Sequence, residues 1–154
     1  MPSPNLHALF LVRHMVEHFA SAGMTLRQIL DWAFFVEKHT KIVDWKWLLN
    51  VLEEYHMKDF LGIVNAICVD DLGFDATNIF PTSCYDSEMK ERVFKDVLYP
   101  EFSGKEPYLL YSRIIFKYRR WKANEWKHRL CYNESMWSAF WSGVWAKILK
   151  PASI

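Results

Sequence analysis

The sequence has little of what interrupts regular structure. Its 154 residues include only five glycines and six prolines, so few positions favour turns or break a helix. It also lacks any sustained alternation of apolar and polar residues, the pattern of a half-buried strand. These absences favour long helices. We therefore expect an all-α fold, a single compact bundle of about six to seven helices that forms one domain over residues 1–154.

The sequence also lacks cysteine pairs, long apolar runs and a large net charge. The three cysteines form no C-x-x-C pair, which argues against a zinc ribbon or a disulfide framework and favours a reducing compartment. No apolar run reaches the roughly 18 residues of a membrane span, and the N-terminus has no basic signal-peptide segment. The expected location is the cytoplasm. A net charge of +1 gives no overall attraction to nucleic acid or anionic membrane.

What the sequence does contain is apolar and aromatic: 51% of its residues are hydrophobic and 17% aromatic. Capping residues, glycines and prolines mark where helices begin and end in this largely apolar sequence. Expected helices cover about 4–22, 25–39, 44–55, 58–72, 87–98, 107–130 and 134–149, with a loop over 74–85. Thr25 and Gln28 form a capping box, and Gly23 makes the turn between the first two helices.

Two polar pairs interrupt the apolar background of these first two helices. His14 and His18 are four residues apart, as are Arg27 and Asp31, so each pair shares one helix face. The short turn at Gly23 makes the helices antiparallel neighbours and can bring the pairs together. We expect the four side chains to form a polar cluster between the helices, without bound metal.

The polar cluster has three competing interpretations. In a metal site, the two histidines and Asp31 would be ligands, but the glutamate of H-E-x-x-H and a fourth ligand are missing. In a phosphate or ligand site, Arg27 would act with a protonated histidine. In a buried polar seam, Asp31 would accept hydrogen bonds from Arg27 and a histidine and so fix the helix pair. The sequence favours the seam, in which Asp31 is buried.

A basic, aromatic stretch follows over residues 113–130. It contains seven Lys/Arg residues and a single acid, Glu125, with aromatic residues interleaved. Such a composition suits phosphate backbones and stacked bases, or an anionic membrane surface; it also occurs in ordinary amphipathic helices. The candidate polyanion contacts are Arg113, Lys117, Arg119, Arg120, Lys122, Lys127 and Arg129. A stand-alone module binding nucleic acid or another polyanion is the alternative function.

No complete active site can be assembled from the sequence. There is no glycine-rich phosphate loop, and no Gly-Ser turn precedes a D-x-D pair of the kind used for two-metal nucleotidyl transfer. Asp70 and Asp71 are adjacent, which points them about 100° apart on an α-helix. No serine or cysteine stands in a nucleophile motif. The chain alone is expected to be inactive, with no cofactor and no metal of its own.

Three blocks of sequence resemble the uncharacterised bacterial nucleotidyltransferase family. They are H-M-V-E-H-F, then L-R-Q-I-L-D-W-A-F-F, and the ending W-K-H-R-L…W-A-K-I-L-K-P. Members of that family resemble DNA polymerase beta-type nucleotidyltransferases with a helical region appended. The resemblance covers nearly the whole chain, as the C-terminal helical part alone.

The resemblance implies an accessory domain that covers the nucleotide or acceptor cleft of a catalytic domain. That catalytic domain would lie N-terminal to the accessory domain or on a separate chain. Mg²⁺ and a nucleotide are implied for that catalytic domain. His14, His18, Arg27 and Asp31 match the family's motif by position and are the candidates to face the cleft. Without its catalytic partner, such a domain would expose the apolar patch which that partner covers, so self-association is a further expectation.

Overall fold

The computed structural model describes residues 3–21, 23–79, 85–100 and 107–132, and these residues form helices joined by short connections. In chain order the helices are α1 (Pro4–Ser21), α2 (Leu26–His39), α3 (Trp45–Glu54), α4 (Lys58–Ala66), the π-helical turn η1 (Ile67–Asp71), α5 (Ser87–Leu98), α6 (Leu110–Ala123) and α7 (Glu125–Tyr132). No strand occurs in these ranges. The expected all-α class is confirmed.

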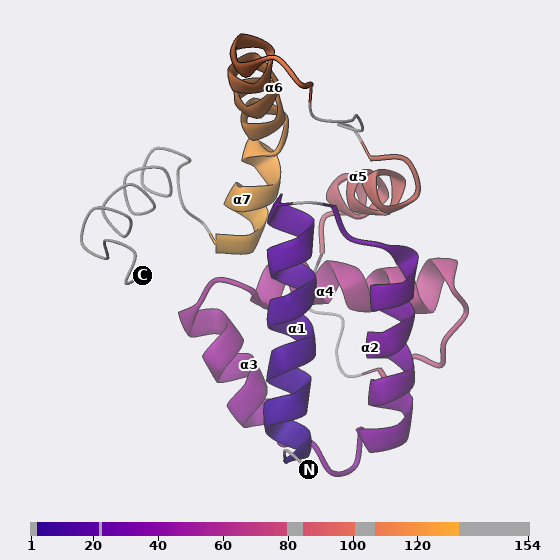
Figure 1. Cartoon of the computed structure of the whole chain (residues 1–154). Coiled ribbons are helices and arrows are strands. Elements are labelled where there is room, and N and C mark those ends of the chain that lie inside the picture. Colours follow the sequence, from indigo (N-terminus) through magenta and orange to yellow (C-terminus); the bar gives the residue numbers. More distant parts are fainter. Residues whose placement is uncertain (1–2, 22, 80–84, 101–106, 133–154) are drawn as a thin grey trace, which may run out of the picture.

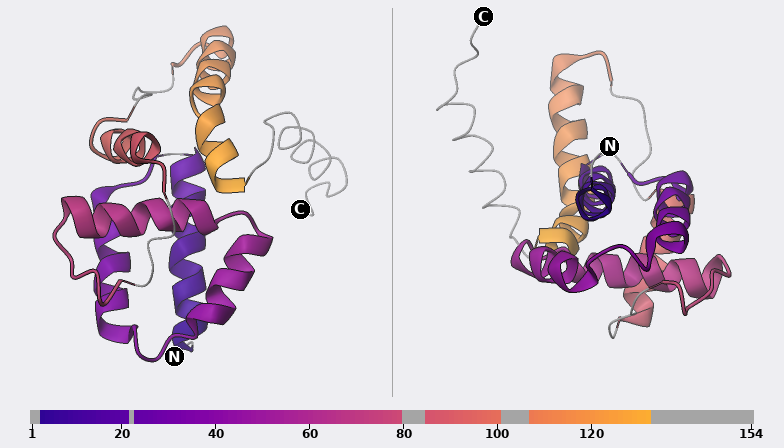
Figure 2. Two further views of the ribbon diagram at one scale, coloured as in Figure 1. Left: turned by 180° about the vertical axis from the view of Figure 1, so that it is seen from behind. Right: turned by 90° about the horizontal axis from the view of Figure 1, so that it is seen from below.

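Helix α4 is at the centre of the fold. It crosses behind α1 and α2 and contacts α3, α5 and α7 (Figures 1 and 2). Every residue from Phe60 to Ala66 is buried, because neighbouring helices cover α4 from several directions. A helix segment that is buried on all sides and mostly apolar is the expected centre of such a core. Phe19 of α1 packs on Phe60, with ring centroids 5.2 Å apart.

The helix boundaries follow local signals. Gly23 has φ of 102°, in the left-handed region that glycine adopts without strain, and its N–H donates to the carbonyl of His18; this ends α1. The Thr25 N–H donates to Oε1 of Gln28 at 2.9 Å, the reciprocal half of the predicted capping box. Asp44 and Asp86 accept from backbone N–H groups at the starts of α3 and α5.

The expected helix over 107–130 is corrected in two respects. It begins at Leu110 rather than at Pro107, and it breaks into α6 and α7 at Asn124. Asn124 is buried, and its side-chain amide donates to the backbone carbonyl of Ser21 at the end of α1. This long-range contact favours the break, because it satisfies a helix-terminal carbonyl of α1. The expected helix over 134–149 lies outside the described residues.

A second correction concerns the helix expected over 58–72. Its last turn, Ile67–Asp71, is wound as a π-helix. The turn ends where Gly73 adopts φ of 74° and the N–H of Phe74 donates to the carbonyl of Cys68. Single π turns are rare and change the direction of the side chains that follow them. Here the turn affects the two acidic residues Asp70 and Asp71.

Candidate functional site

One face of α1 carries stacked aromatic and imidazole rings. The rings of Phe10 and His14 are stacked, with centroids 5.7 Å apart, and His14 meets His18 edge-on at 4.4 Å. The spacing of four residues along the helix brings these side chains together. The face is only partly covered, since Phe10 is 61% exposed and both histidines are half-buried. His14 and His18 therefore share one face of α1, as their spacing predicts.

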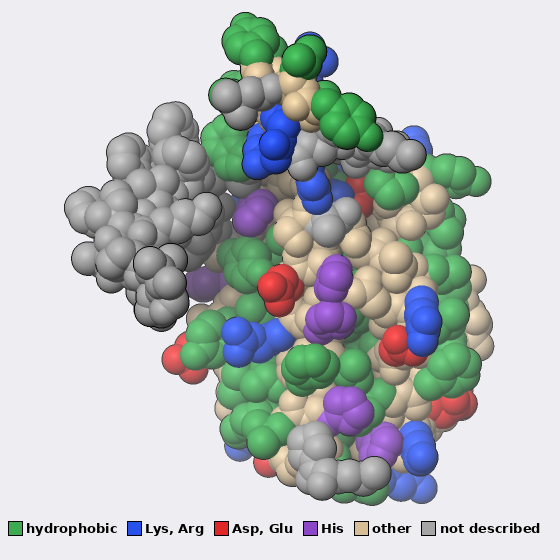
Figure 3. Space-filling view, viewed as in Figure 1, with side chains coloured by type: hydrophobic (Ala, Val, Ile, Leu, Met, Phe, Trp, Pro, Cys, Tyr) green, Lys and Arg blue, Asp and Glu red, His purple; other side chains and the backbone are tan. Residues whose placement is uncertain are grey.

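The ring cluster extends onto α2 through Phe35. His7 of α1 meets the Phe35 ring edge-on, with centroids 4.8 Å apart. His39 stacks on the same ring at 4.6 Å, and its Nδ1 lies 3.0 Å from the carbonyl oxygen of Phe35. Figure 3 shows histidines in a column over α1 and its boundary with α2. We call His7, Phe10, His14, His18, Phe35 and His39 the ring face.

Arg27 and Asp31 do not belong to a buried seam. Their closest atoms, Nε and Oδ2, are 4.0 Å apart, and the two side chains are 88% and 58% exposed. A pair in that environment stabilises a helix by only a few tenths of a kcal/mol. The expectation that Asp31 is buried is therefore wrong. Whether the four motif residues face a catalytic cleft stays a prediction.

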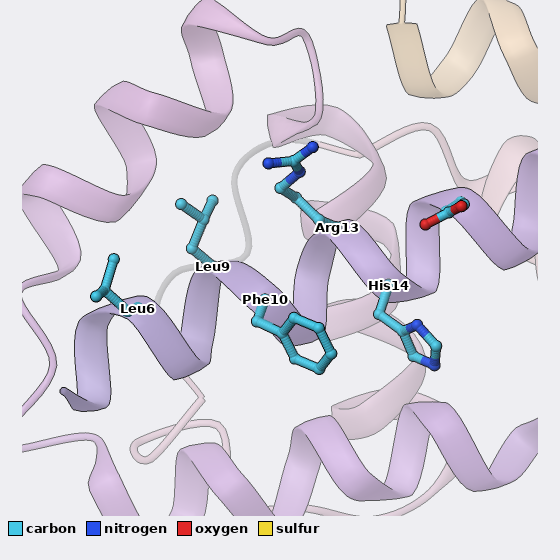
Figure 4. Close-up of a pocket in the computed structure, with 6 residues that line it drawn as sticks. Leu6, Leu9, Phe10, Arg13 and His14 are labelled. Carbon is cyan, nitrogen blue, oxygen red and sulfur yellow. The ribbon is translucent and has the colours of Figure 1, made fainter. Parts of the chain in front are cut away.

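A shallow pocket opens beside the ring face. It has a volume of about 310 Å³, and Figure 4 shows that it follows one side of α1. Its lining residues lie three and four positions apart and combine apolar, basic and acidic side chains: Leu6, Leu9, Phe10, Arg13, His14 and Glu17. An apolar patch with charged residues at its edge can accept a side chain from a binding partner.

The seven candidate polyanion contacts separate into different environments. Arg113, Lys117, Arg119 and Lys122 are exposed along α6. The Arg120 guanidinium donates to the carbonyl of Ser21 at 2.7 Å, which joins the base of α6 to the end of α1. Arg129 is exposed and lies 3.6 Å from Glu125 one turn away. The arginines and lysines of α6 are therefore the principal exposed basic group in this stretch.

The expectation that Lys127 contacts a polyanion is wrong, because the Lys127 side chain is buried. Its ammonium donates to Oδ2 of Asp96 at 2.5 Å, and the side chains of the two residues are 3% and 0% exposed. The same ammonium lies over the rings of Phe19 and Trp126, at 5.1 and 5.6 Å from their centroids. This buried ion pair connects α5 to α7, whereas the buried carboxylate was expected at Asp31, between α1 and α2.

The π turn directs two carboxylates to a single lysine. Lys90 of α5 donates to Asp70 at 3.1 Å and to Asp71 at 3.0 Å, and the Tyr85 hydroxyl donates to Asp70 at 2.7 Å. The hydrogen bonds from Tyr85 and Lys90 lower the pKa of Asp70. Although desolvation opposes it, hydrogen bonding to the two carboxylates raises the pKa of Lys90. This cluster joins η1 to α5 and neutralises much of its own charge.

The two cysteines in the described ranges are also poorly placed for chemistry. Cys68 and Cys131 are fully buried. Burial raises the pKa of the Cys68 thiol to about 12 and raises the pKa of Cys131 as well, so both stay protonated and weakly nucleophilic near neutral pH. Within the same ranges, no three His, Cys, Asp or Glu side chains meet in a metal-binding arrangement.

Residues 1–72 are similar to a family described as uncharacterised nucleotidyltransferase. No curated protein and no solved structure gives a significant match to the chain. The matched segment is just under half of the sequence and runs from α1 to the end of η1, so it includes the ring face, the pocket and the Arg27–Asp31 pair. The resemblance that was expected over nearly the whole chain is found over this segment.

Proposed function

We propose that the chain acts as a non-catalytic helical accessory domain of a nucleotidyltransferase-like protein. The observation that carries the proposal is the family similarity over residues 1–72, in a sequence without the Gly-Ser turn and D-x-D pair of nucleotidyl transfer. Similarity to this family, combined with the absence of that catalytic motif, fits a domain that assists a catalytic partner. Mg²⁺ and the nucleotide would then be bound by that partner, as expected for two-metal chemistry.

The ring face and its pocket are the surface proposed to contact the catalytic partner. Leu6 and Phe10 are 55% and 61% exposed, although they lie on the helix that contributes Val12, Val16 and Phe19 to the core. Arg13 and Glu17 border the pocket, so an apolar centre is surrounded by charge. This arrangement is typical of protein interfaces, where an exposed aromatic residue often contributes much of the binding energy.

Replacing Phe10 with lysine tests this docking surface. Loss of a central aromatic contact commonly costs 2 kcal/mol or more, so Phe10→Lys should weaken binding to a separately purified catalytic domain of the matching family by at least about tenfold. Isothermal titration measures the affinity. The matched control is Tyr55→Lys, because Tyr55 is 58% exposed at the end of α3 and lies off the proposed surface. Equal affinities for the two variants, or no binding by the unmodified chain, would contradict the proposal.

A further inference from the structure

Helix α6 extends beyond the packed helices and has little contact with them. Figures 1 and 2 show that it reaches away from α1 to α5, and its main helix contact is with α7. None of its described side chains is buried. Helix α6 is attached to α1 at its own C-terminal end, where the side chains of Arg120 and Asn124 donate to the carbonyl of Ser21. Packing within the described fold therefore does not explain the apolar residues of this helix.

These apolar residues form one continuous stripe. Tyr111, Ile114, Ile115 and Tyr118 follow the i, i+3, i+4, i+7 spacing of a single helix face. Their exposed fractions are 77%, 61%, 38% and 58%. Just before the helix, Tyr108 and Leu109 are also exposed. Contiguous apolar surface of this kind marks a site of interaction with a protein or a membrane.

The charge on the same segment has one sign. Residues 107–124 contain five Lys/Arg and no Asp or Glu. At about 100° per residue, Lys117 and Arg119 fall on opposite edges of the apolar stripe, and both are exposed. Figure 3 shows hydrophobic and basic side chains together at the end of the molecule formed by α6. Basic residues at the edges of a Tyr/Ile stripe can place their alkyl stems on the apolar surface and their charges near phosphates.

We propose that α6 binds an anionic membrane surface, with its apolar stripe toward the acyl chains and its basic side chains among the lipid headgroups. Helices that lie in the membrane interface combine these two features. At about 1.5 Å per residue, the 14 residues of α6 extend about 21 Å, enough to lie along the surface. No helix in the described ranges is long and apolar enough to cross a membrane. Because α6 lies outside residues 1–72, the inference does not depend on the proposed function.

Two other occupants of the stripe fit less well. A second copy of α6 docked on the stripe would bring Lys117, Arg119 and Lys122, which lie beside or in line with it, near the same residues of the other copy. Like charges at an interface oppose association. Single-stranded nucleic acid would stack its bases on aromatic rings in a basic groove, whereas two isoleucines occupy the middle of this stripe on a projecting helix. An anionic lipid surface matches both the aliphatic centre and the positive edges.

Vesicle sedimentation with the full chain tests the proposal. The chain should bind vesicles of phosphatidylcholine and phosphatidylglycerol in equal parts, and should bind pure phosphatidylcholine at least about tenfold more weakly. Ile114→Ser combined with Tyr118→Ser should abolish most binding by removing apolar insertion. The matched control is Ile42→Ser with Tyr55→Ser, since these side chains are 65% and 58% exposed and lie off α6. Circular dichroism verifies that every variant is folded.

Charge variants test whether the basic side chains of α6 contact the lipid headgroups. Arg119→Gln with Lys122→Gln should weaken binding to the anionic vesicles by about thirtyfold, because each basic residue near such a surface contributes roughly a factor of five. The control variant Lys41→Gln with Lys46→Gln, at exposed positions away from α6, should change vesicle binding little. The proposal is overturned if the full chain does not sediment with anionic vesicles or if the α6 variants bind like their controls. It is also overturned if the Ile114/Tyr118 variant instead loses binding to a single-stranded RNA or loses self-association.

Discussion

Asp96→Ala is expected to lower the free energy of unfolding by about 3–5 kcal/mol, because it leaves the buried Lys127 ammonium without its partner. The carboxylate and the ammonium are 0% and 3% exposed, so water cannot readily replace the lost contact. The rings of Phe19 and Trp126 near the ammonium compensate only in part, since a cation–π contact contributes on the order of 1–2 kcal/mol.

Urea denaturation followed by circular dichroism measures this effect. Glu125→Ala is the control, because Glu125 lies 3.6 Å from Arg129 in an exposed pair one helical turn apart, for which about 0.5 kcal/mol is expected. The double variant Asp96→Leu/Lys127→Met should recover much of the stability, since an apolar pair of similar size can replace a buried ion pair. A change for Asp96→Ala no larger than that for Glu125→Ala would show that this ion pair does not stabilise the contact between α5 and α7.

Trp32→Ala is expected to destabilise the chain by about 3–5 kcal/mol, the range for removing a large buried aromatic side chain. Trp32 is fully buried in α2, and its indole N–H donates to Oδ1 of Asn65 in α4 at 2.8 Å. Trp32→Phe keeps much of the packing but removes the donor, so it should cost about 1–3 kcal/mol. Phe34→Ala is the control, because Phe34 is an aromatic residue of the same helix that is 57% exposed. The difference between the two alanine variants measures the effect of burial.

The same denaturation experiment distinguishes the outcomes for Trp32. The expected order of destabilisation is Trp32→Ala, then Trp32→Phe, then Phe34→Ala. If Trp32→Phe is no more destabilising than Phe34→Ala, the hydrogen bond to Asn65 does not contribute as the geometry indicates. If Trp32→Ala is also mild, Trp32 does not contribute to the core as its complete burial indicates.

Local signals predicted most helix boundaries. The glycine at position 23, the cap at Asp44 and the Thr25–Gln28 box act within one turn of the helix ends that they define, so they can be read directly from the sequence. The break at Asn124 and the π turn at Ile67 could not be read in this way. The break at Asn124 is accompanied by a contact with Ser21, 103 residues away, and the acidic residues of the π turn meet Lys90 of α5.

The candidate site was predicted in part. The pairing of His14 with His18 follows from helical spacing. The burial of Asp31 was wrong, although the sequence contains the evidence against it: Ile29, Trp32 and Val36 define the buried side of α2, and residue 31 lies almost opposite that side at about 100° per residue. That Lys127 pairs with Asp96 could not be predicted, because nothing in the sequence links two residues 31 positions apart.

The measurement that tests the accessory-domain account most directly is nucleotidyl transfer by the purified chain with Mg²⁺ and each radiolabelled nucleoside triphosphate in turn. The sequence lacks the carboxylate pair that two-metal transfer needs, so no labelled product above the level of a heat-denatured sample is expected with any nucleotide or polynucleotide acceptor. A His14→Ala/His18→Ala variant measured alongside should give the same background. Turnover by the unmodified chain would contradict the account. If the variant also loses that turnover, the ring face is part of an active site rather than a docking surface.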